Sequence, residues 1–508
     1  MKNVQQTSVL VSLMSAALCL AGCGGSDNNG TTAPTAGTSG AGSTSGSGST
    51  SGSGGTSGSG STSGSGSTSG SGSTSGSGST SGSGSGSSST ASTSCTGTTP
   101  AAAGSPTIST QPADQTVVVG QHALFNVVAA GATTYQWCQN GSPINGATSA
   151  TYYSGALAST DASDSFTVVV GNTSGTVASK AAAVHINPNT DGSPPASFWG
   201  NTAALPAATQ TMTFSFVNAT NGVYPDSQVF WSFSGKTNTG APIKEVHSIA
   251  DAPTYDMPAV SSARMYFYIA PTQADIANTN TSYYDFIEFN IGPAASGVGW
   301  NFDGDTTRVD AFGIKTAFHL HCNDSATTDV QRGEDYGTFL EDRAITFLKY
   351  QAETPSQFSG TLQYAPYRIT EPGASGFSVG GAQAGYYNSY ITQVWTANNI
   401  DVTQVPEPTG FLNFASNQQP DLSAAMERHV AQNPNTFNAS GKLVNSNFWS
   451  TLPSSDFYPE GPANFYAKYW HTHGIAGKAY GFPYDDVGGY STNVQCNSPQ
   501  WLVVALGW

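Results

Sequence analysis

Residues Tyr283–Ile291 read YYDFIEFNI, a stretch in which side chains of opposite character alternate along the chain. Such alternation is typical of a half-buried β-strand, because successive side chains point to opposite faces of a sheet. One face carries the polar and aromatic side chains Tyr284, Phe286, Glu288 and Asn290. The other carries Tyr283, Ile287, Phe289 and Ile291, together with Asp285. The stretch therefore predicts a strand whose polar face holds a carboxylate between aromatic rings.

Further strands and a few helices are predicted around this stretch. Alternating or short apolar runs mark strands at Thr211–Val217, Val229–Phe233 and Ala263–Ile269, and a buried terminal strand at Gln500–Trp508. Helical patterns occur later, at Phe339–Lys349 and Asp421–Ala431. A β-rich half followed by a mixed half predicts an α+β fold.

A second polar strand is predicted at Thr306–Phe318, with Arg308, Asp310 and Phe312 on one face. If it neighbours the first strand, Glu288 and Asp310 face one groove. Aromatic rings stack on sugar rings, and apolar surroundings raise the pKa of a carboxyl toward that of a working acid. The groove therefore suits a saccharide, although a surface glutamate and an aspartate paired with Arg308 would give the same pattern.

The charge balance limits the classes of ligand that the protein can bind. Lys and Arg number 15 against 31 Asp and Glu, which gives a formal net charge of −16. Phosphate recognition needs a basic patch, so the composition excludes nucleic acid as a partner. The 9 Trp and 22 Tyr favour a neutral, hydroxyl-rich ligand.

The N-terminus has the pattern of an export signal. Lys2 precedes an apolar run from Val9 to Ala21 that is too short to span a bilayer. The run ends in the residues LAGC, with the cysteine at position 23, and resembles the lipobox of bacterial lipoproteins. The resemblance implies a signal peptide at 1–22 and a lipid anchor on Cys23, so that the protein is exported to the bacterial cell envelope, at the outer membrane or cell surface. Ordinary signal cleavage and secretion without a lipid is the alternative.

Two segments separate the anchor from the region discussed above. Residues 23–104 are rich in Gly, Ser and Thr and predict a disordered linker. Residues 105–187 contain short β-branched runs between turns, which predict an all-β sandwich. The stretch Tyr135–Trp137 and the turn after it resemble the immunoglobulin-like repeats of bacterial surface proteins, with Trp137 as the buried tryptophan. We expect this domain to be a spacer; a glycan-binding role would rest on Tyr153.

Four short blocks connect residues 195–508 with a known family. They are Asn464–His471 (NFYAKYWH), Gly477–Gly488 (GKAYGFPYDDVG), Phe286–Asn290 (FIEFN) and Arg308–Gly313 (RVDAFG). Together they resemble glycoside hydrolase family 64, the thaumatin-like β-1,3-glucanases. The resemblance implies a β-barrel or sandwich-like subdomain beside a mixed α/β subdomain, with a wide groove between them. It also implies inverting endo-hydrolysis of β-1,3-glucan to short oligosaccharides. We expect the protein to be a monomer and to need no cofactor or metal.

The same resemblance assigns residues to roles. Glu288 matches the general acid and Asp310 the general base, and inversion requires their carboxyls to lie roughly 6.5–9.5 Å apart. Asn290 and Trp300 fall where the family lines its groove. Asp485 and Asp486 match a block that binds sugar hydroxyls or completes a turn; because adjacent extended residues point oppositely, only one of them should face substrate.

Two departures from the family leave questions open. The segment Gly292–Asp305 is long and brings two additional carboxylates, Asp303 and Asp305, either of which is a rival to Asp310 as the base. Thr472 stands where the family pattern has an acidic residue, so no role is assigned there.

Three other motifs have competing explanations. The pairs His319/His321 and His471/His473 have the spacing of metal ligands on a strand, but no acidic third ligand accompanies them. Residues Gly376–Gly380 (GFSVG) match a serine-hydrolase elbow, which needs a preceding strand and a following helix that the flanking glycines argue against. Cys322 and Cys496 predict a disulfide in an oxidising compartment, and the pairing of Cys95 with Cys138 stays open.

Two functions besides hydrolysis are compatible with these patterns. A thaumatin-like protein could bind β-glucan without cleaving it, and a surface adhesin could bind through the sandwich while the last domain supports it. Release of reducing ends from glucan separates the first of these from a glucanase.

Overall fold

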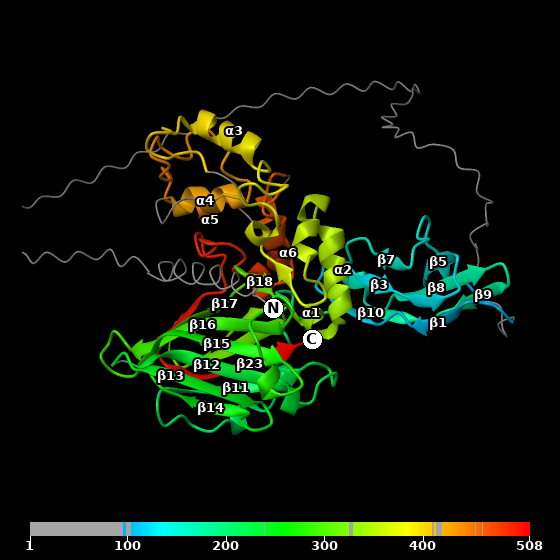
Figure 1. Ribbon diagram of the computed structural model, residues 1–508, viewed down its shortest axis with the longest axis horizontal. Coiled ribbons are helices and arrows are strands. Elements are labelled where there is room, and N and C mark those ends of the chain that lie inside the picture. The colour runs from blue at the N-terminus through cyan, green and yellow to red at the C-terminus, as the bar shows by residue number, and fades with distance from the viewer. Residues whose placement is uncertain are drawn as a thin grey trace, which may run out of the picture. The chain divides into compact units, whose positions relative to one another are not determined.

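A computed structural model describes residues 95–97, 103–237, 239–324, 329–408, 411–412, 419–452, 454–459 and 461–508 (Figure 1). The expected signal peptide, Cys23 and nearly all of the expected linker lie outside these residues.

The N-terminal part of the described chain consists of short strands. They are β1 (Thr107–Thr110), β2 (Gln115–Val117), β3 (Leu124–Asn126), β4 (Val128–Ala130), β5 (Thr134–Gln139), β6 (Ser142–Pro143), β7 (Thr151–Tyr153), β8 (Ser165–Asn172), β9 (Gly175–Ala178) and β10 (Ala182–Ile186). The largest sheet has the order β2-β10-β8-β5-β6, with β9 beside β8. Trp137 on β5 is fully buried and packs near Phe125 and Tyr152. Cys138, the next residue, is bonded to Cys95.

Two larger sheets make up the strand-rich half of the region from residue 195 onward. The first has the order β14 (Thr254–Met257), β11 (Met212–Ala219), β23 (Pro499–Gly507), β19 (Lys315–Cys322) and β20 (Asp329–Gly333). The second has the order β13 (Pro242–Ser248), β12 (Val229–Thr237), β15 (Val260–Ile269), β16 (Tyr283–Pro293), β17 (Trp300–Thr306) and β22 (Val494–Cys496). A disulfide between Cys322 and Cys496 joins them.

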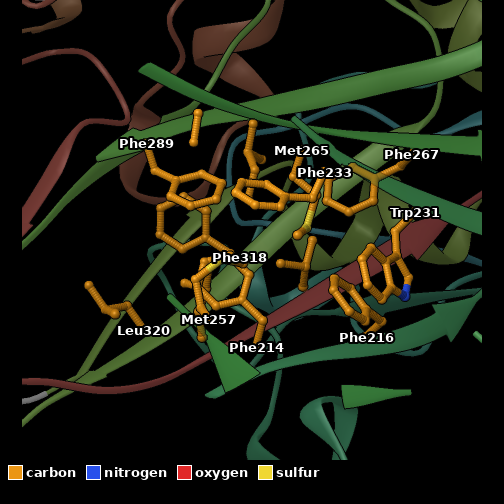
Figure 2. Packing of buried hydrophobic residues seen from close by; sticks show 14 of the residues in the cluster. Phe214, Phe216, Trp231, Phe233, Met257, Met265, Phe267, Phe289, Phe318 and Leu320 are labelled. Atoms are coloured by element: carbon orange, nitrogen blue, oxygen red, sulfur yellow. The ribbon is translucent and has the colours of Figure 1, made fainter. Parts of the chain in front are cut away.

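The main hydrophobic core lies between these two sheets. Figure 2 shows Phe214 and Phe216 of β11 and Phe318 of β19 pointing toward rings from the other sheet. The Phe214 and Phe289 ring centroids are 5.1 Å apart, and those of Phe216 and Trp231 are 4.9 Å apart. Because the core takes one face of β16, its alternate side chains are left on the opposite face.

Strand β23, the last of the chain, lies in the middle of its sheet. It pairs in parallel with β11 and antiparallel with β19. Leu502, Val504 and Leu506 face the main core, whereas Val503 and Ala505 pack on the other side with Phe339 and Trp199. Both faces of this strand are therefore buried, in agreement with its nearly continuous apolar sequence.

The helices lie between β20 and β22 in the sequence. They are α1 (Tyr336–Leu340), α2 (Arg343–Glu353), α3 (Asn388–Asn398), α4 (Pro420–Glu427), α5 (Phe448–Thr451) and α6 (Phe465–Thr472). The single helix predicted at Phe339–Lys349 is wrong: Asp342 interrupts it, and its carboxylate caps α2 by accepting from the Ala344 N–H at 2.8 Å. No helix among the described residues combines the length and the apolar character needed to cross a membrane.

Candidate active site

The outer face of the second sheet carries a row of charged side chains. Glu288 of β16 is paired in register with Arg264 of β15 on one side and with Asp305 of β17 on the other. Residues directly opposite each other on neighbouring antiparallel strands project from the same face. The expected alternation in Tyr283–Ile291 is confirmed, because Asp285, Ile287 and Phe289 are buried whereas Glu288 is partly exposed.

Glu288 is held by a charged hydrogen bond. Arg264 donates from Nε to Glu288 Oε1 at 2.6 Å, and both side chains are about one third exposed, at 31% and 30%. The Arg264 guanidinium also lies 4.8 Å from the centre of the Phe286 ring, which stands beside Tyr266. The carboxylate is thus oriented beside the buried Phe286 and the partly exposed Tyr266.

Asp310 follows β17 in a turn rather than in a strand, so the single strand predicted over Thr306–Phe318 is wrong. Strand β17 ends at Thr306, and the chain resumes as β18 (Ala311–Phe312) and then β19. Arg308 and Phe312 are buried while Asp310 is exposed, so these three residues do not share one face.

A buried ion network explains the turn. The Arg308 guanidinium lies 2.8 Å from Asp285 Oδ2 and 2.6 Å from Glu334 Oε1, and all three side chains are at most 5% exposed. Asp285 Oδ2 also accepts from the Gly313 N–H at 2.9 Å. A Cβ on Gly313 would stand 1.8 Å from the carbonyl oxygen of Tyr284, so only glycine fits there. Arg308 therefore anchors the turn from beneath and does not pair with Asp310.

Helix α6 holds the same turn through the block that resembles family 64. The Tyr466 hydroxyl donates to the carbonyl oxygen of Arg308 at 2.6 Å. The Trp470 ring lies 5.7 Å from the Arg308 guanidinium and stacks on Phe312. These aromatic residues of the C-terminal block are buried and position Asp310 through its neighbours.

Asp310 lies in an environment that alters its acidity. Although its side chain reaches solvent, the surrounding protein desolvates the carboxyl and raises its pKa. The Arg264 and Arg368 guanidiniums offset part of this rise, and Asp285 adds to it. Because Arg264 also binds Glu288, the two carboxyls predicted to act together lie near one cation.

The two rival carboxylates are placed differently. Asp305 is 7% exposed, and burial raises its pKa well above the usual range, with Glu288, Asp303 and Asp486 adding to the rise. Asp303 is more exposed, and its Oδ1 accepts from the Asn493 side chain at 2.8 Å.

The other predicted site residues divide into two groups. Asn290 is on the same face as Glu288, and its Oδ1 accepts a hydrogen bond from the Ser262 N–H at 2.7 Å. Asp486 is exposed, and its negative charge contributes to the raised pKa of Asp305. Trp300 instead shares the face of Phe302 and packs against the main core. Asp485 is fully buried, where Arg428 and His471 lie 2.6 and 2.9 Å from its oxygens. Of the adjacent pair, only Asp486 therefore faces outward, as predicted, although the two residues lie in a turn and not in an extended segment.

The four histidines of the two pairs and the serine of the GFSVG motif make hydrogen bonds or ion pairs with other residues. His319 and His321 both contact Asp329, whereas His471 contacts Asp485 and His473 contacts Glu353. Within the described chain, the one group of possible metal ligands is Cys322, Asp324 and Cys496, whose cysteines are bonded to each other. Ser378 follows a 3₁₀ turn at Pro372–Ser375 and donates to the Gly373 carbonyl, so the elbow geometry is not formed.

Three charged residues near the site were missed in the sequence. Arg264 could have been found, because alternation along Ala263–Ile269 puts it on one face with Tyr266 and Tyr268. Arg368 and Glu371 carried no signal: β18 pairs with β21 (Ile369–Thr370), and this pairing brings them to Asp310. The Glu371 N–H donates to the Asp310 carbonyl at 3.1 Å, and burial raises the pKa of Glu371 to about 7.

Comparison with known proteins relates the chain to one family. A family model described as beta-1,3-glucanase, of glycoside hydrolase family 64, matches residues 211–410 and 401–506. Similar solved structures include a laminaripentaose-producing β-1,3-glucanase of this family from Paenibacillus barengoltzii, which is 24% identical with a TM-score of 0.48 over 79% of this chain and 100% of that one. The same enzyme complexed with laminarihexaose is 23% identical with a TM-score of 0.49 over the same shares, 79% and 100%. A β-1,3-glucanase domain from Clostridium beijerinckii is 18% identical with a TM-score of 0.48 over 60% of this chain and 100% of that one. No curated protein matches the chain.

Proposed function

The chain belongs to glycoside hydrolase family 64, the β-1,3-glucanases, and from this premise we propose that it cleaves glucan by inversion, with Glu288 as the general acid and Asp310 as the general base. Hydrolysis of β-1,3-glucan is the activity of the family. The observation that carries the residue assignment is that Arg264 hydrogen-bonds Glu288 and also acts electrostatically on Asp310, while both carboxyls reach solvent.

Each carboxyl has a distinct task in the cleavage. Glu288 transfers its proton to the glycosidic oxygen as the bond from that oxygen to the anomeric carbon breaks. A water attacks the anomeric carbon from the opposite side, and Asp310 takes the proton that this water loses. Burial makes the Asp310 carboxylate a stronger base than an ordinary aspartate, which suits this role.

The geometry favours Asp310 over Asp305 as the base. Residues directly opposite on neighbouring strands have Cβ atoms about 4.5–5.5 Å apart. An inverting pair needs carboxyls roughly 6.5–9.5 Å apart, so that a water fits between them and the sugar. Asp305 is directly cross-strand to Glu288, which is closer than this separation. Asp303 is held by Asn493 and lies across from Asn290.

The surrounding face supplies the groups that a neutral polysaccharide uses. Tyr266 and Tyr284, both partly exposed, offer aromatic rings for the faces of glucose units, while Asn290 and Asp486 offer polar atoms for their hydroxyls. Asp485 is fully buried, so we assign it to the support of the fold. Trp300 is partly exposed but packs against the main core, and we assign it the same role.

The stereochemistry of the first product tests this assignment. We expect wild-type protein to release short oligosaccharides from laminarin whose new reducing ends are α-anomers before mutarotation. Water that attacks opposite a departing β-linked oxygen inverts the anomeric carbon. Proton NMR at the first minutes of digestion distinguishes this from retention. β-Anomers formed first would contradict the mechanism, and glucan binding with no new reducing ends would favour a binding protein without turnover.

The proposal includes two roles for the N-terminal residues. The sheets around Trp137 support an immunoglobulin-like sandwich over 105–187 that acts as a spacer, on a chain that works as a monomer. The sequence ahead of it supports export, with a thaumatin-like catalytic region held at the envelope through lipid on Cys23.

Replacing Cys23 tests the anchor. We expect the full-length precursor, expressed in a bacterium with lipoprotein processing, to sediment with membranes, because several acyl chains on one residue give stable attachment. The Cys23→Ala variant should appear in the soluble extracellular or periplasmic fraction with unchanged laminarin hydrolysis. Equal membrane association of both proteins, measured by fractionation and immunoblot, would contradict a lipid at this residue.

A further inference from the structure

Asp305 is the buried member of the row Arg264, Glu288 and Asp305. Its cross-strand pairing with Glu288 puts the two carboxyls on the same face of the sheet, one strand apart. Arg264 contacts Glu288 from the far side through Oε1. Asp305 therefore lies on the side of the catalytic acid that the arginine does not occupy.

One oxygen of Asp305 lacks a partner among the residues that the structure describes. Its Oδ1 is buried and accepts no hydrogen bond from them, although the residue as a whole is 7% exposed. A buried charged oxygen without a donor is costly, by several kcal/mol for an isolated ion. A protonated carboxyl removes most of this cost, because it is neutral and can donate to a neighbouring acceptor.

The charges that face Asp305 favour the same protonated form. Glu288 comes from β16, Asp303 from its own strand and Asp486 from the turn after α6, and all three are acidic. Arg264 of β15 is the cation that opposes them. Burial has the largest effect, and together these groups raise the pKa of Asp305 well above that of a free aspartate.

We propose that Asp305 is a positioning residue that keeps a proton beside Glu288 and returns it to Glu288 after each cleavage. This inference rests on the proposed function, in which Glu288 loses one proton per turnover and Asp310 gains one. The Asp305 O–H bond breaks as a new O–H bond forms on the Glu288 carboxylate. Asp305 then takes a proton from solvent and Asp310 releases one to solvent, so the protons balance over the cycle.

The pH profile of an Asp305→Asn variant tests the inference. Asparagine keeps the size of the side chain but has no carboxyl proton to transfer. With kcat and KM on laminarin measured across the pH range, we expect KM to change less than about twofold and kcat to fall about tenfold, a fraction of the effect of losing a general acid. The decline of kcat at alkaline pH, its alkaline limb, should also begin at a pH lower by about one unit, because the variant lacks the carboxyl that holds the proton in reserve.

Two further proteins make the result interpretable. Asp305→Ser is smaller and neutral and should shift the limb in the same direction, which keeps the test available if asparagine impairs folding. Asp329→Asn, on the edge strand of the other sheet, should leave the limb in place. A wild-type profile in both Asp305 variants would overturn the inference. So would a loss as complete as that of Asp310→Asn, because Asp305 would then be the base. If Glu288→Gln were fully active, the proposed function itself would fail instead.

Discussion

The Glu288→Gln variant is expected to lose about 10³-fold in kcat on laminarin while it keeps its affinity for the glucan. Positioned proton transfer contributes roughly 10²–10⁴-fold to such reactions, and an amide has no proton of suitable acidity to give. The carbonyl of the substituted amide would still accept from Arg264, whose Nε lies 2.6 Å from Glu288 Oε1 in the native protein. Steady-state kinetics, glucan pull-down and thermal melting together check this result.

Substrates with different leaving groups distinguish the acid from the base. An aryl laminarioligosaccharide whose phenolate departs without protonation should restore most of the activity of Glu288→Gln. Asp310→Asn should stay inactive on the same substrate, because its defect is in activating water. If only Asp310→Asn regained activity on this substrate, Asp310 would be the general acid and Glu288 the general base.

Glu245→Gln is the matched control for the acid. Glu245 belongs to edge strand β13 of the same sheet, is 40% exposed and contacts His247 rather than the row around Arg264. It undergoes the same chemical change as Glu288 and should keep wild-type kinetics. Equal losses in both variants would point to a general effect of charge on the sheet and would contradict a special role for Glu288.

Much of the site was predictable because it lies on a regular strand. Alternation along Tyr283–Ile291 alone assigns Glu288 and Asn290 to the open face and Phe289 to the core. Asp485, which is buried, and Asp486, which is exposed, also differ as expected, but they lie in a turn, where strand alternation is not the reason. Local pattern is sufficient along the strand because one face of the sheet is covered by the core.

Prediction failed where long-range ion pairs override the local pattern. The sequence around Arg308 alternates like a strand, but Asp285 and Glu334 draw the guanidinium inward and bend the chain. These partners come from β16 and from the residue after β20, so no spacing within the segment reveals them. Arg428 likewise is fully buried against Asp485, and its position ends the helix expected to continue to Ala431. At both arginines, the backbone conformation is thus determined by tertiary ion pairs and not by the local sequence pattern.

Removing the last nine residues, 500–508, is expected to abolish the folding of the region from 195 onward. The deletion takes almost all of β23, the central strand between β11 and β19, and leaves both neighbours without their backbone partners. Four large side chains on it, Leu502, Val503, Val504 and Leu506, are at most 1% exposed. At roughly 1.5–3 kcal/mol each, their burial contributes about as much as the whole net stability of a typical domain, 5–15 kcal/mol. Near-UV circular dichroism and calorimetry should show no cooperative transition.

Three variants with increasing damage to β23 are expected to show that folding requires this strand and not merely the last residue of the chain. Deletion of Trp508 alone removes the ring that packs against Tyr283 and Arg343 but keeps β23, so the protein should still melt cooperatively at a lower temperature. Leu502→Ala should cost about 2–5 kcal/mol and remain folded, because it leaves a cavity while keeping every backbone pair. The nine-residue deletion removes the pairs as well, so Phe214 of β11 and Phe318 of β19, shown in Figure 2, lose the strand that lies between theirs. A soluble, cooperatively melting protein that ends at residue 499 would show that β11 and β19 can close the sheet without it, and would contradict this account of the core.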